Sequence, residues 1–193
     1  TYSNAGVLEV TLAEIRSDEQ LSLSMSRFAS LLQQAQIVAE SAGVDVVELG
    51  SLLADDILSM GDHSGLPLFQ VTELSSDVLD MRRTAYNGQQ ETGSNKKGPK
   101  RLDKPALLLA RVGGKLKPTL FDPVDGPIAV GNNVFMFRVD TSRADAEYIA
   151  IELRSPMVQD QLDAYHQGST IASIAKADLL RVRVRLPDLS EQK

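Results

Sequence analysis

The sequence predicts an α+β fold: a single domain with one mixed β-sheet, peripheral helices and an N-terminal helical appendage. Its length of 193 residues, 42% of them hydrophobic and 24% charged, is typical of one soluble globular domain. Residues 106 to 112 form a nearly continuous apolar run, as in a strand buried on both faces. Residues 181 to 186 alternate between arginine and an apolar residue, which indicates a strand with one buried face. Helical patterns lie between these two strands.

The first 43 residues are expected to form a linker and an amphipathic helix belonging to a longer parent chain, and residues 44 to 193 the main domain. Residues 18 to 42 repeat apolar side chains at steps of three and four, which places them on one helical face. Packing of this helix on the domain is favoured over binding of a partner helix.

The early part of the main domain is expected to contain short elements. Residues 44 to 49 and 68 to 72 are rich in apolar and β-branched residues, which predicts strands. Residues 51 to 58 fit a short helix. Residues 61 to 67 and 75 to 77 carry loop and turn residues.

The later part alternates between strands and helices. Ser155 followed by Pro156 is a typical helix start, because proline suits the first helical position. The predicted strands span 106 to 112, 128 to 130, 134 to 139 and 181 to 186. The predicted helices span 145 to 153, 155 to about 166 and 174 to 180.

A long polar loop is predicted over residues 82 to 105, where Leu102 is the sole Ile, Leu, Val, Met or Phe. Long loops in compact domains are usually functional or disordered. The end of this loop is basic, through Lys96, Lys97, Lys100, Arg101 and Lys104.

The charge distribution is strongly uneven along the chain. The net charge of −6 combines −11 over residues 1 to 80 with +5 over residues 81 to 193. Within the second part, residues 81 to 117 hold 10 basic and 2 acidic residues, a net charge of +8. Such local asymmetry indicates an anionic partner despite the acidic total.

No enzymatic or metal motif is found, so the chain is expected to be non-catalytic, with no cofactor and no metal. Cysteine is absent, which excludes disulfides and thiolate metal sites and fits a cytoplasmic protein. Only His63 and His166 could contribute imidazole ligands, too few for a structural zinc site. Gly113-Gly114-Lys115 lacks the rest of a phosphate-binding loop. No apolar run reaches the length of a membrane span.

The second half of the chain resembles the target recognition domains of type I restriction–modification specificity subunits. The resemblance begins with residues 104 to 115, which are similar to the start of the family's central strand. Residues 168 to 171 (Gly-Ser-Thr-Ile) and 186 to 192 (Leu-Pro-Asp-Leu-Ser-Glu-Gln) carry its most specific motifs. Residues 46 to 80 match more loosely.

This resemblance implies sequence-specific recognition of double-stranded DNA, with the domain reading one half of a split site. The implied partners are a DNA methyltransferase, which flips its target adenine out of the duplex, and restriction subunits. The segment 1 to 43 is more similar to the linker of a recognition domain fused behind an N6-adenine methyltransferase, so both kinds of parent stay open. The alternative is a protein-interaction module that binds a partner through its acidic first half and reads no bases.

The predicted DNA-binding residues combine two chemistries. Arginine and lysine suit guanine or phosphate, and asparagine and glutamine suit adenine. We expect residues 82 to 101 to be disordered alone and to become ordered on DNA, with a solvated surface loop as the alternative. The candidates are Arg82, Arg83, Asn87, Gln89, Gln90, Asn95, Lys96, Lys97, Lys100, Arg101, Arg111 and Lys115.

Two further basic features have competing interpretations. Gly113 and Gly114 would let the backbone beside Arg111 approach a phosphate, or they form a plain turn with Arg111 in a salt bridge. The arginines of residues 181 to 186 are expected to form a solvated face balanced by acids such as Asp178 and Asp188.

Overall fold

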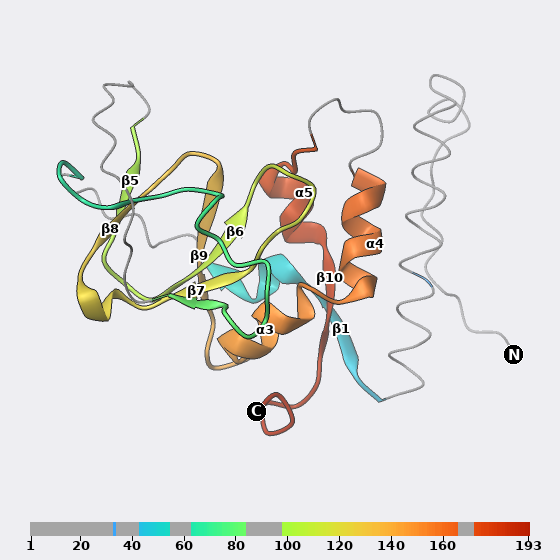
Figure 1. The fold of residues 1–193 in the computed structure, drawn as a ribbon. Helices are drawn as coiled ribbons and strands as arrows, with labels where there is room; N and C mark the ends of the chain where they lie inside the picture. The colour runs from blue at the N-terminus through green and yellow to red at the C-terminus, as the bar shows by residue number, and fades with distance from the viewer. Residues whose placement is uncertain (1–32, 34–42, 55–62, 84–97, 166–171) are drawn as a thin grey trace, which may run out of the picture.

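The computed structural model describes residues 33, 43–54, 63–83, 98–165 and 172–193 (Figure 1). The predicted helix over residues 18 to 42 lies outside the described residues except for Gln33, which is helical. The division of the chain at residue 43 therefore stays a prediction.

The α+β class is confirmed, with ten short strands and three α-helices in the described part of the chain. The strands are β1 Asp45–Glu48, β2 Leu53–Ala54, β3 Leu68–Phe69, β4 Arg82–Arg83, β5 Lys100–Leu102, β6 Ala106–Ala110, β7 Thr119–Phe121, β8 Ile128–Val130, β9 Val134–Val139 and β10 Arg183–Leu186. The helices are α3 Ala146–Glu152, α4 Pro156–Tyr165 and α5 Lys176–Arg181.

These strands form three sheets where the sequence predicted a single one. The largest has the order β2-β9-β6-β7-β4 and is mixed, because β4 runs parallel to β7 while its other pairs are antiparallel. The second sheet has the order β3-β8-β5, and the third pairs β1 with β10.

The strand β6 divides the two main hydrophobic cores. All five of its residues are buried, as the apolar run predicted. Leu107 and Leu109 face one core, to which α3, α4, α5 and β10 also contribute. Leu108 faces the other core, together with residues of β5 and β8. Figure 1 shows this arrangement, with β5 and β8 on one side of β6 and the helices on the other.

Two of the predicted helices begin within one residue of the predicted start, while α5, predicted over 174 to 180, begins at Lys176. Asp145 is the N-cap of α3, and its carboxylate accepts hydrogen bonds from the backbone N–H groups of Glu147 (2.9 Å) and Tyr148 (3.0 Å). Pro156 opens α4 directly after Ser155. These starts agree with the sequence because a cap depends on residues within one helical turn.

The final strand has the predicted buried face, since Val182 and Val184 are fully buried. Its arginines are paired with acids other than those expected. Arg183 pairs with Glu48 on β1, and Arg185 pairs with the buried Glu152 on α3. Arg181 belongs to the end of α5 and not to the strand.

Several local predictions in the first half were wrong. Residues 49 to 51 form a 3-10 helix and residues 53 to 54 a strand, so the described part of the predicted helix 51 to 58 is not α-helical. The strand predicted over 68 to 72 ends at Phe69. The predicted loop 82 to 105 contains two strands, β4 at its start and β5 near its end. These residues form strands because β4 pairs with β7 and β5 pairs with β8.

Candidate nucleic-acid interface

The structure describes six of the predicted DNA-binding residues. Arg82 and Arg83 form β4, Lys100 and Arg101 lie in β5, and Arg111 and Lys115 flank the turn after β6, so the six occupy three separate places. Asn87, Gln89, Gln90, Asn95, Lys96 and Lys97 lie outside the described residues.

A groove of about 510 Å³ lies beside β4, at the end of the largest sheet where β6 begins. Its floor is apolar, and includes Leu107, Leu120 and Val139. Its charged lining comprises Arg82, Arg83, Lys104, Arg138, Asp122, Asp145 and Glu147. Acidic and basic groups therefore meet at this groove, although residues 81 to 117, which include β4, have a net charge of +8.

Arg138 and Glu147 are among the lining residues that the sequence analysis missed as site candidates. Arg138 interrupts the apolar strand β9 and is exposed, so a charged residue within an apolar strand could have been a signal for it. Glu147 had no such signal, because it lies 65 residues from its partner Arg82.

The Arg82–Glu147 pair is bidentate. The Nη2 of Arg82 lies 2.5 Å from Oε2 of Glu147, and its Nε lies 3.3 Å from Oε1. The side chains are 68% and 43% exposed, so the pair is open to solvent and to a ligand. The hydrogen bond and the negative charge of Glu147 raise the pKa of Arg82 above its usual value.

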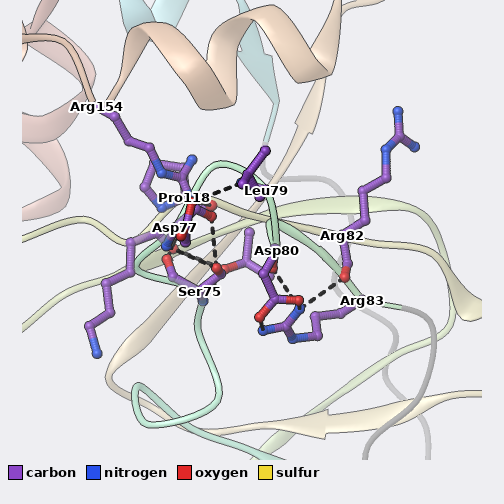
Figure 2. A network of polar contacts seen from close by, with 10 residues as sticks. Ser75, Asp77, Leu79, Asp80, Arg82, Arg83, Pro118 and Arg154 are labelled. Carbon is purple, nitrogen blue, oxygen red and sulfur yellow. Dashed lines mark hydrogen bonds and ion pairs between the residues drawn. The ribbon is translucent and has the colours of Figure 1, made fainter.

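Arg83 is held by a second carboxylate, that of Asp80. Its guanidinium nitrogens lie 2.5 and 2.6 Å from the two carboxylate oxygens of Asp80. It also donates to the backbone carbonyl of Asp80, a contact drawn in Figure 2. The hydrogen bond from Arg83 lowers the pKa of Asp80 below its usual range. With 23% of its side chain exposed, Arg83 is less available to a ligand than Arg82.

The segment that leads into β4 is anchored to the helices by Arg154 (Figure 2). Its guanidinium donates to the carbonyls of Ser75 and Asp77, at 3.3 Å each, and to that of Pro118. It also donates to the carbonyl of Ala150 in α3, at 2.7 Å. Burial lowers the pKa of Arg154. These bonds fix the start of β4 with respect to α3, which carries Glu147.

The basic residues of β5 lie on a different sheet. Lys100 is exposed, while Arg101 is half-buried and its Nε lies 3.3 Å from a carboxylate oxygen of Asp103. Arg101 is therefore also near a carboxylate from its own chain.

Gly113 and Gly114 form the predicted turn after β6, and both have positive φ, 98° and 74°. The N–H of Gly113 donates to the carbonyl of Ala172 at 2.9 Å, so this group is already used within the fold. Arg111 and Lys115 are exposed. Within the described residues Arg111 forms no ion pair, which contradicts the salt-bridge interpretation of its role.

The basic segment is thus split along β6. The groove with Arg82 and Lys104 lies at the beginning of this strand, and Arg111 follows its end. At about 3.4 Å per residue, Leu107 and Arg111 are roughly 14 Å apart along the strand. These residues do not converge on one point, so a partner that contacts both groups must span this distance.

Within the part of the chain that the structure describes, no three His, Cys, Asp or Glu side chains are grouped so as to hold a metal ion. His63 is half-buried, and His166 lies outside the described residues. None of the described helices is long and apolar enough to cross a membrane.

Two solved structures are similar to this chain. An HsdS subunit from Thermoanaerobacter tengcongensis is 17% identical, with a TM-score of 0.43, over 94% of this chain and 43% of its own length. A structure that concerns complex assembly and conformational transition of the type I R-M system is 16% identical, with a TM-score of 0.46, over 90% and 44%. The chain spans less than half of either protein. No family model and no curated protein matches.

Proposed function

We propose that this chain is a DNA target recognition domain that reads one half of a split site in double-stranded DNA. The observation that carries this proposal is the exposed Arg82, a guanidinium at the rim of a groove, directly before the segment with the predicted Asn, Gln and Lys readers. A guanidinium that makes two parallel hydrogen bonds can read the O6 and N7 atoms of guanine.

The exposed cations at the two ends of β6 support this function through phosphate contacts. Lys104 and Arg138 lie near Arg82, and Arg111 and Lys115 lie at the other end of the strand. The roughly 14 Å from Leu107 in the groove floor to Arg111 is comparable to the width of the major groove of DNA, about 12 Å. Phosphate contacts position a protein on DNA without reading sequence.

In this proposal the chain performs no chemistry. It delivers a partner, an N6-adenine DNA methyltransferase with or without restriction subunits, to a site in bacterial DNA in the cytoplasm. The parent is either a specificity subunit with two such domains or a methyltransferase fusion. The order of the motifs in residues 104 to 192 supports this assignment.

The test is the methylation pattern of the host genome before and after residues 82 to 101 are exchanged for those of a related domain. A changed methylated motif is expected. An unchanged motif, with methylation still active, would contradict the assignment of this segment. Binding should also be salt-dependent, because about six phosphate contacts cost roughly a thousandfold in affinity between 50 and 200 mM salt.

A protein-interaction module is the second candidate, and Leu79 is the observation that favours it. This leucine is 95% exposed, and its neighbour Val78 is 38% exposed. The turn that carries them is stiffened by hydrogen bonds within residues 75 to 81 and by Arg154. If Leu79→Ser abolishes assembly with the methyltransferase and leaves DNA binding intact, this surface serves a protein partner.

A further inference from the structure

The carboxylate of Glu147 occupies the donor groups of Arg82 that a DNA ligand would use. Its two oxygens receive hydrogen bonds from Nε and Nη2 of Arg82. Carboxylate, phosphate and the O6/N7 edge of guanine all offer two acceptors to one guanidinium. The carboxylate is therefore a chemical stand-in for either DNA group, supplied by the chain itself.

The position of this carboxylate is fixed by its surroundings. The backbone N–H of Glu147 donates to the side chain of Asp145, the N-cap of α3. The N–H of Asp145 in turn donates to Oε1 of the buried Gln192 at 2.7 Å, and Gln192 donates to the carbonyl of Pro187 at 2.8 Å. The C-terminal segment thus holds the start of α3 in place beneath Glu147.

The partner side of the pair is equally constrained. β4 is held in register beside β7 by backbone hydrogen bonds, in which the carbonyls of Met81 and Arg83 accept from Leu120 (2.7 Å) and Asp122 (2.8 Å). Arg154 links the segment before β4 to α3. The backbones that carry Arg82 and Glu147 are therefore fixed relative to each other, while both side chains stay open to solvent.

We infer that Glu147 competes with DNA for the guanidinium of Arg82 and thereby tunes the affinity of the domain for its site. This inference rests on the proposed function and deepens it. On non-cognate DNA, Arg82 stays with Glu147, because exchange of one acceptor pair for another gains little. On cognate DNA, a guanine edge placed at Arg82 by the other base contacts replaces the carboxylate. The ion pair is broken only in the cognate complex, so its cost lowers cognate affinity more than non-cognate affinity.

Glu147→Gln is the direct test, since it removes the charge and keeps the shape of the side chain. The intact protein is measured with a cognate duplex, identified from the methylated motif, and with a scrambled duplex of equal length. Because exposed ion pairs contribute up to about 1 kcal/mol, we expect affinity for the cognate duplex to rise about three- to fivefold. Affinity for the scrambled duplex is expected to rise less than about twofold.

Glu48→Gln is the matched control. Glu48 is 50% exposed and pairs with Arg183, 39% exposed, on the two-stranded sheet and away from the groove. Glu48→Gln therefore changes the net charge by the same amount as Glu147→Gln, and it also breaks an exposed ion pair between a glutamate and an arginine. The control should leave the ratio of the two affinities unchanged. An equal rise in cognate-duplex affinity for both variants would show a bulk-charge effect and overturn the inference.

Two further outcomes would overturn it. No change on Glu147→Gln would show that the pair does not compete with DNA. An equal rise for both duplexes would show that Arg82 takes a phosphate and not a base edge. In the background of Arg82→Gln, Glu147→Gln should have no effect, because the competition needs both residues. If the unaltered protein binds neither duplex, the proposed function itself fails, a result distinct from the others.

Discussion

Gln161 pairs with the backbone of Arg183 as a neighbouring strand would. Its side-chain carbonyl accepts from the N–H of Arg183 at 2.8 Å, and its amide donates to the carbonyl of the same residue at 2.9 Å. Gln161 is 1% exposed, so these groups are shielded from water. One side chain of α4 therefore supplies both backbone hydrogen bonds of Arg183 on the edge of β10 opposite β1.

Replacement of Gln161 by methionine should destabilise the protein by about 2–4 kcal/mol. The volume is kept, but two backbone groups lose their partners, and each buried unsatisfied group costs about 1–3 kcal/mol. Urea unfolding measures the change. Asp163→Asn, on an exposed position of the same helix, should change stability by less than about 0.5 kcal/mol. An equal effect of both variants would contradict the role of Gln161.

Arg154→Met should destabilise the protein by about 2–4 kcal/mol, because hydrogen bonds from a charged group contribute about 1.5–3 kcal/mol. Four backbone carbonyls, those of Ser75, Asp77, Pro118 and Ala150, would each lose a hydrogen bond from this guanidinium. Hydrogen exchange should also show faster opening of residues 75 to 83. Arg111→Met, at an exposed arginine, is the control and should leave both readouts unchanged. If hydrogen exchange over residues 75 to 83 is unaltered in Arg154→Met, the anchoring role of Arg154 is contradicted.

Gly50→Ala should destabilise the fold by about 1–3 kcal/mol through overpacking. A Cβ at this position would lie 2.9 Å from the carbonyl oxygen of Leu180 and 3.1 Å from its Cβ, and backbone atoms cannot easily move away. Gly131→Ala is a matched control, because its Cβ would meet the nearest atoms at 3.6 Å, an ordinary contact. Thermal unfolding of the two variants compares them directly, and similar melting temperatures would refute the packing argument.

Stability should decline as the pH rises from 10 through 12. Burial, and then the negative charge of Glu152, raise the pKa of Tyr148 from 10.0 to about 12. A raised tyrosine pKa favours the neutral folded form, so its contribution is complete below pH 10 and is lost as the pH approaches 12. Burial raises the pKa of Tyr165 too, which adds to the same decline.

The test of this pH dependence is urea unfolding across the alkaline range for the unaltered protein and for Tyr148→Phe. The variant should lose less stability over that range, although it also loses the 3.2 Å hydrogen bond from the Tyr148 hydroxyl to the carbonyl of Arg185. Parallel curves for the two proteins would contradict the raised pKa.

The helices and the two best-marked strands could be predicted because their signals are local. The carboxylate of Asp145 and the ring of Pro156 act within one turn of the helix they start. The apolar run at β6 could be predicted because both faces of that strand are buried. The alternation of residues at β10 could be predicted because one face of that strand is buried. The strands β4 and β5 could not be predicted, since their polar residues become strands only through the edges of β7 and β8.

The candidate site was predicted in part. The sequence by itself determined that basic residues concentrate over 81 to 117, because charge is a property of composition. Only the tertiary structure decided that the described basic residues lie at the two ends of β6 and on β5, and that Arg82 meets Glu147. Ion pairing depends on distances of a few ångströms between residues far apart in the chain, 65 positions in this case. Spacing along the sequence carries no information about such distances, and the packing of α3 against the sheet sets them.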